Sequence, residues 1–164
     1  MAFGTLARFA QDKPVANIAI ITGTVYGGAQ LVADEIQSAL ENLDHTVSVW
    51  EEPSVNDLEE DTLDLLLVCT STTGAGELPD DIAPFYTALV DTPPRITTLK
   101  YAVIALGDSS YGDTYCGAGL SIDNALQEAG AIQVEAPLQL DAMETVTPED
   151  DAVPWAMELV DRHL

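Results

Sequence analysis

Short apolar runs alternate along this chain with longer segments whose apolar residues recur at helical spacing. The apolar runs predict strands, and they cover residues 17–22, 46–50, 64–70, 101–106 and 131–140. The helical patterns cover residues 27–42, 79–90, 118–129 and a last segment that follows Pro148. In this last helix the expected core positions are Val153, Met157 and Val160. Regular alternation of this kind is typical of an α/β protein.

The strand patterns also indicate how the sheet is built. Residues 64–70 are apolar on both faces, which places them at the centre of a parallel sheet. The run 131–140 contains Pro137, which predicts an edge strand. Right-handed crossovers between five such strands predict a three-layer α/β fold of order 2-1-3-4-5 with helices on both faces. We expect one domain over 17–164, preceded by a short N-terminal extension over 1–16.

In a sheet of this order, ligands bind beyond the carboxyl ends of the strands, where the strand order reverses. The loop after the first strand, 22–28, combines threonine hydroxyls with glycines and leads directly into a helix. Unpaired N–H groups at a helix N-terminus suit a phosphate group. The loop contains neither GxxxxGK[ST] nor GxGxxG, and it has no lysine or arginine, so only neutral donors would hold a phosphate. A simple turn that caps the helix is the alternative for this loop alone.

The loops after the third and fourth strands carry a second signal. Residues 71–79 form a glycine-containing loop after an apolar strand, which suits close approach of the backbone to a flat ring. Residues 107–117 place Tyr111 and Tyr115 in a polar loop, where a tyrosine could stack on a conjugated ring while its hydroxyl stays hydrated. An ordinary strand-to-helix turn, and a Tyr111 packed against a neighbouring helix, are the alternatives. All three loops are expected at one edge of the sheet, where one ligand could touch them all.

The stretches TSTTGAGELPD (70–80) and VIALGDSSY (103–111), together with GTVYGGA (23–29), resemble the FMN site of flavodoxins. The similarity is greatest to the short MioC- and YqcA-like bacterial flavodoxins and to the FMN domains of diflavin reductases, and it runs from about residue 17 to the C-terminus. It implies a flavodoxin-like fold, an FMN cofactor, and electron transfer without substrate chemistry of the chain's own. The chain departs from the family pattern at Tyr26, at Thr73, and by one extra residue between Tyr111 and Tyr115.

The resemblance implies a role for three groups of residues, with the peptide at Gly74 near the flavin N5 and Tyr111 stacked on the ring. The FMN site would consist of Thr24, Val25, Tyr26, Gly27, Gly28 and Ala29 at the phosphate, Ser71, Thr72, Thr73 and Gly74 along the ring, and Leu106, Gly107, Asp108, Tyr111, Tyr115 and Cys116 on its other side. Asp141 aligns with an acidic residue near the cofactor of the diflavin domains, and a surface aspartate at a strand end is an equal alternative.

The net charge of the chain limits which classes of partner it can bind. The chain has 28 acidic against 5 basic residues, a formal net charge of −23, which disfavours nucleic acid. The acidic surface could be a solvated coat or could steer basic proteins, and both readings stay open. We expect a monomer that meets a basic-surfaced reductase and an acceptor enzyme. We also expect no membrane partner and a cytoplasmic location, since the sequence shows neither a bilayer-spanning apolar run nor a signal-peptide pattern.

Other chemistry finds little support in the sequence. The two cysteines, Cys69 and Cys116, form no CxxC pair and cannot hold an iron–sulfur cluster alone. His45 and His163 are expected away from the three loops, which leaves no nucleophile with a base. The acidic stretch 51–61 is expected to be a surface connector, and no metal site is predicted. The alternative function is an FMN-dependent oxidoreductase such as a quinone reductase, for which so short a chain offers little room.

Overall fold

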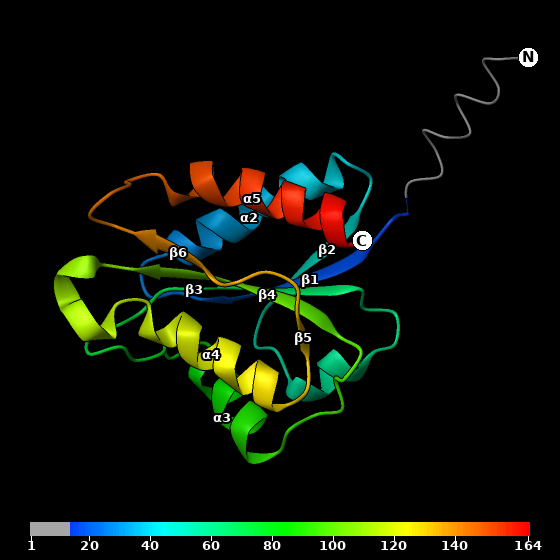
Figure 1. The fold of residues 1–164 in the computed structure, drawn as a ribbon, viewed down its shortest axis with the longest axis horizontal. Helices are drawn as coiled ribbons and strands as arrows, with labels where there is room; N and C mark the ends of the chain where they lie inside the picture. Colours follow the sequence, from blue (N-terminus) through cyan, green and yellow to red (C-terminus); the bar gives the residue numbers. More distant parts are fainter. Residues whose placement is uncertain (1–13) are drawn as a thin grey trace, which may run out of the picture.

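A parallel sheet runs through the middle of the molecule, and helices cover both of its faces (Figure 1). The structure, a computed structural model, describes residues 14–164. The strands are β1 (Asn17–Gly23), β2 (Thr46–Trp50), β3 (Leu65–Thr70), β4 (Lys100–Gly107), β5 (Ile132–Gln133) and β6 (Leu138–Asp141). The helices are α2 (Gly28–Glu41), α3 (Ala83–Asp91), α4 (Gly117–Glu128) and α5 (Pro148–His163), with the 3-10 segments η1 (Val55–Glu59) and η2 (Ser109–Thr114).

The order of the strands is β2-β1-β3-β4-β5, as the sequence pattern predicts. Helices α2 and α5 lie on one face of the sheet, and α3 and α4 lie on the other (Figure 1). Every residue of β3 is buried, which confirms its central position between β1 and β4. Side chains of β3 alternate between two cores, with Leu65, Leu67 and Cys69 facing α2 and α5.

The fifth strand is split in two. Residues 132–133 form β5 and residues 138–141 form β6, and both pieces pair in parallel with β4. The break includes Pro137, whose nitrogen carries no hydrogen and cannot continue the ladder. This confirms an interrupted edge strand. In β6, Asp141 pairs with Gly107 at the carboxyl end of β4.

Two helix predictions need correction. Helix α3 begins at Ala83 and not at residue 79, because the N–H groups of Ile82 and Ala83 both donate to the Pro79 carbonyl oxygen in a preceding turn. In α5 the buried positions are Ala152, Ala156, Leu159 and Val160. Of the three predicted positions only Val160 is buried, while Val153 and Met157 lie at the margin of the core. The apolar face is therefore rotated slightly from the predicted stripe.

The acidic stretch 51–61 is more than a surface connector. It contains η1, which begins at a capping box in which the Ser54 hydroxyl accepts from Asn56 N–H and Asp57 accepts from Ser54 N–H. Val55 and Leu58 are buried under it, in the core on the α3 side. Because most residues of this stretch are acidic or polar, the sequence pattern did not identify Val55 and Leu58 as core residues.

Candidate functional site

The carboxyl ends of β1, β3 and β4 lie side by side, so the three predicted loops meet. Gly23 pairs with Thr70, and Thr70 pairs with Ala105 in the next strand. Just beyond the sheet, Ser71 N–H donates to the Gly23 carbonyl oxygen at 2.8 Å. This edge is where the strand order reverses, at β1 and β3.

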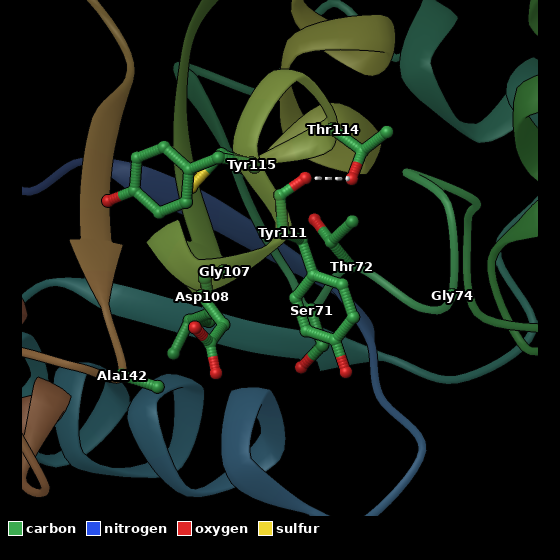
Figure 2. A pocket seen from close by; sticks show the side chains of 11 residues that line it. Ser71, Thr72, Gly74, Gly107, Asp108, Tyr111, Thr114, Tyr115 and Ala142 are labelled. Atoms are coloured by element: carbon green, nitrogen blue, oxygen red, sulfur yellow. Dashed lines mark hydrogen bonds between the residues drawn. The ribbon is translucent and has the colours of Figure 1, made fainter.

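A cavity of about 220 Å³ opens between the loops that follow β3 and β4 (Figure 2). It contains most of the ring-binding residues that the sequence predicts. It is lined by Ser71, Thr72, Gly74, Leu106, Gly107, Asp108, Tyr111, Thr114, Tyr115, Cys116 and Ala142. Ala142 was not predicted, and Thr114 was expected only as part of the loop 107–117. Ala142 enters because it directly follows β6, which pairs with β4 as the predicted strand order implies.

The base of the cavity is tightly packed. A Cβ atom on Gly107 would lie 2.7 Å from the Cys116 backbone nitrogen and 2.9 Å from its sulfur, so this position requires glycine. Cys116 is fully buried, and its thiol donates to the Ala105 carbonyl oxygen at 3.4 Å. Burial raises the pKa of the Cys116 thiol, which therefore stays protonated at neutral pH. The cysteine therefore forms part of the cavity wall as a buried, protonated thiol.

The two tyrosines of the loop after β4 differ in their surroundings. Tyr111 is 63% exposed, which argues against packing on a neighbouring helix and leaves its ring available for stacking. Its loop is held by Tyr111 N–H donating to the Asp108 carbonyl oxygen and by the Thr114 hydroxyl donating to the Tyr111 carbonyl oxygen (Figure 2). Tyr115 is half-buried, and burial together with the neighbouring Cys116 raises its pKa to about 12. Its phenol is therefore neutral.

The loop after β3 is a short, closed turn. Thr73 N–H donates to the Glu77 carbonyl oxygen, and Glu77 N–H donates back to Thr73. Gly74 has a φ of +45°, a conformation that side chains rarely adopt. Thr73 does not line the ring cavity. It lines an adjacent cavity of about 460 Å³, together with Thr24 and Val25 of the first loop.

The first loop presents backbone rather than side chains. Gly27, the residue before α2, has a φ of +90°, and no side chain caps the helix. The Thr24 hydroxyl accepts from Gly27 N–H at 2.8 Å. The Tyr26 side chain is 99% exposed and the Ala29 side chain is fully buried, so neither is placed to bind a phosphate. Their backbone N–H groups and those of Gly28 remain the available donors at the start of α2.

Asp141 connects the site to the edge strand. Its carboxylate accepts from the N–H of Ser109 at 3.0 Å and from the N–H of Met143 at 2.9 Å. Hydrogen bonding from the hydroxyl and N–H of Ser109, followed by that from Met143, lowers the pKa of Asp141 below its usual range. Asp141 therefore ties the loop that carries Tyr111 to the end of β6.

Within residues 14–164, neither basic nor histidine side chains line the ring cavity, and no metal cluster is present. None of the residues lining the ring cavity is basic, and Asp108 is acidic. His45 accepts from Ala16 N–H, and His163 lies 3.1 Å from Glu135, so both are occupied away from the cavity. Over residues 14–164 no cluster of His, Cys, Asp or Glu could hold a metal ion. In the same range, no helix is both long and apolar enough to cross a membrane.

Comparison with known proteins gives one consistent result. The flavodoxin family model matches residues 20–155. An uncharacterized protein of Pseudomonas aeruginosa is 45% identical over 86% of this chain and 94% of its own length. Flavodoxin YqcA of Pectobacterium carotovorum is 43% identical over 86% of this chain and 93% of its own.

Solved structures agree. A cysteine-to-serine mutant of flavodoxin from Pseudomonas aeruginosa superimposes with a TM-score of 0.82 at 43% identity, covering 90% of this chain and 98% of that one. Oxidised flavodoxin 1 of Bacillus cereus gives a TM-score of 0.78 at 26% identity, covering 91% and 99%. The family consists of FMN-binding electron carriers rather than enzymes. This chain belongs to the flavodoxin family and is an FMN-binding electron-transfer protein.

Proposed function

We propose that this flavodoxin binds the FMN ring in the cavity between the loops after β3 and β4, with the phosphate at the start of α2. One arrangement carries this assignment. The exposed Tyr111 ring lies beside a cavity whose base is formed by Gly107, and the neighbouring strand β1 leads into the N-terminus of α2, which has no side-chain cap. These features fit FMN, because a flat ring needs close backbone approach and a phosphate needs unpaired N–H donors.

The chain's own residues would bind and orient the cofactor. When bound, FMN supplies the one-electron chemistry, and the protein tunes it through contacts and charge. Tyr111 covers one side of the ring site, while the closed turn 73–77 presents backbone at Gly74 on the other side. Thr24, Val25 and Thr73 line the adjacent cavity, where the loop after β1 meets the loop after β3. The neutral Tyr115 and Cys116 fill the rear wall and exclude water.

The proposal extends to partners. The chain would shuttle single electrons between a reductase and an acceptor enzyme, both with basic docking surfaces. The net charge of −23 supports this, because it attracts basic proteins over distances that salt screening limits. A solvated acidic coat accounts for the same charge and can coexist with docking. We propose a monomer that acts in the cytoplasm.

The test is reconstitution followed by a search for turnover. Purified protein incubated with excess FMN and then desalted is expected to retain one FMN per chain, released by denaturation and identified by chromatography. The isolated holoprotein should oxidise NADH or NADPH no faster than free FMN does, and rapid cytochrome reduction should require an added reductase. Recovery of FAD, or of no flavin, would refute the site, and fast NAD(P)H oxidation by the protein alone would refute the carrier role.

A further inference from the structure

The Asp81 carboxylate is bonded to the loop that should hold the phosphate. Both of its oxygens accept from Thr24 N–H, at 3.0 and 3.1 Å. Asp81 lies in the loop after β3, 57 residues further along the chain. The acceptor is ionised, so the hydrogen bond is charge-assisted, and the single N–H is shared between the two carboxylate oxygens. The contact therefore joins the first and second loops of the site directly.

Packing explains why Asp81 lies at this position. The next residue, Ile82, is fully buried, and it lies so close to Gly23 that a Cβ atom there would be 2.6 Å from the Ile82 Cγ2 atom. The turn at Pro79 fixes Ile82 further, because Ile82 N–H donates to the Pro79 carbonyl oxygen. With Ile82 anchored against Gly23, the preceding Asp81 faces the residue that follows Gly23, which is Thr24.

The contact also restricts which donors remain for a phosphate. Thr24 N–H is taken by Asp81, and Gly27 N–H is taken by the Thr24 hydroxyl at 2.8 Å. These two bonds fix both ends of the turn 24–27 before α2 begins. The backbone N–H groups at the start of α2 are then held in position, and neither of these two hydrogen bonds uses them.

We propose that Asp81 is a positioning residue for FMN, which orders the phosphate loop by accepting from Thr24 N–H while contacting no part of the cofactor. This inference rests on the phosphate placement proposed above. A carboxylate near a phosphate is repulsive, so the useful property of Asp81 is its acceptor oxygen and not its charge. A neutral acceptor of the same shape should therefore serve at least as well.

The experiment measures binding of FMN and of riboflavin, which lacks the phosphate, to the apoprotein of each variant by flavin fluorescence quenching. Asp81→Ala should weaken FMN binding about tenfold, the change expected for the loss of one charge-assisted hydrogen bond, and should change riboflavin binding less than about twofold. Asp81→Asn should bind FMN at least as tightly as the unmodified protein. Asp91→Ala is the control, since it removes an exposed carboxylate at the C-terminal end of α3 and should not weaken FMN binding.

Three results would overturn the inference. Asp81→Ala could bind FMN within twofold of the unmodified protein or more tightly, or it could lose FMN and riboflavin binding equally. Alternatively, Asp81→Asn or the control Asp91→Ala could bind FMN as weakly as Asp81→Ala. Circular dichroism of each variant confirms that it is folded, as expected for substitutions at exposed positions. If the unmodified protein binds neither flavin, the proposed site fails, and this outcome is distinct from a failure of the Asp81 assignment.

Discussion

Gly107 and Cys116 pack so closely that no side chain fits between them: a Cβ atom on Gly107 would lie 2.7 Å from the Cys116 nitrogen. Gly107→Ala should therefore destabilise the fold by about 1–3 kcal/mol, the usual range for overpacking, and should weaken FMN binding because the cavity floor must move. Thermal unfolding and FMN titration measure the two effects. Gly28→Ala is the control for stability, since its added Cβ would meet no atom within 4 Å beyond its chain neighbours and its own helix backbone. An unchanged Tm for Gly107→Ala would contradict the packing.

Tyr111 provides the second prediction. Tyr111→Ala should weaken FMN binding by roughly 1–3 kcal/mol through lost aromatic contact and buried area, and Tyr111→Phe should retain most of the affinity. Tyr26→Ala is the matched control, because Tyr26 is 99% exposed and belongs to the site only through its backbone. Fluorescence titration gives the three dissociation constants. If Tyr111→Ala changes affinity less than twofold, Tyr111 does not stack on the ring.

The third prediction concerns Asp141 and pH. Its folded-state pKa is lowered by hydrogen bonds from Ser109 and Met143, so its charge stabilises the folded state above the unfolded pKa of about 3.9 and this contribution is lost as pH falls through the folded value. Asp141→Asn should lower Tm at pH 7, and the difference from the unmodified protein should shrink below about pH 4. Calorimetry across pH 3 to 7 measures it. A difference that does not depend on pH would show that Asp141 contributes no charge-dependent stability.

Salt separates the two readings of the acidic surface. If the carboxylates steer a basic reductase, the rate of electron transfer should fall as ionic strength rises, because screening shortens the reach of the field. If they form a coat, Tm should rise with salt as self-repulsion is screened. Stopped-flow reduction and thermal unfolding over one salt series report both. A flat rate with a rising Tm would leave the coat alone.

The charge near the cavity should also affect the second one-electron reduction potential. None of the residues lining the ring cavity is basic, and Asp108 adds negative charge, so a second electron enters a negative field. We expect this potential to lie below that of free FMN and to rise in the double variant Glu77→Gln, Asp113→Asn. The control is Glu41→Gln with Asp44→Asn, at the far end of α2, which removes as much charge. Potentiometry decides, and a potential at or above that of free FMN would contradict the expectation.

The sequence predicts the sheet well because its strands are apolar and its helices are periodic. The predicted start of α3 at residue 79 was wrong. Ile82, Phe85 and Leu89 have helical spacing, but residues 79–82 form a turn in which the Pro79 carbonyl oxygen accepts from Ile82 N–H, and the helix begins only at Ala83. Ile82 still reaches the core, so the periodicity identified the buried residue but not the helix boundary.

The site shows a different limit. The ring cavity could be predicted from strand ends, yet Thr73 and Val25 line a neighbouring cavity, which only the closed turn 73–77 explains. The hydrogen bonds from Thr24 N–H to Asp81 and from Ser109 N–H to Asp141 join segments 57 and 32 residues apart, and no local motif signals them. Such tertiary contacts depend on which strand ends lie side by side.

Cys69 and Cys116 are both fully buried, and burial raises the pKa of each thiol. A reduced flavin in air generates hydrogen peroxide, and peroxide oxidises thiolates far faster than protonated thiols. Cys69 is therefore shielded from this by-product by burial in the core and by protonation, and Cys116, at the wall of the ring cavity, is shielded by protonation. Repeated cycles of reduction and air oxidation should leave the chain without sulfenic acids and without covalent dimers.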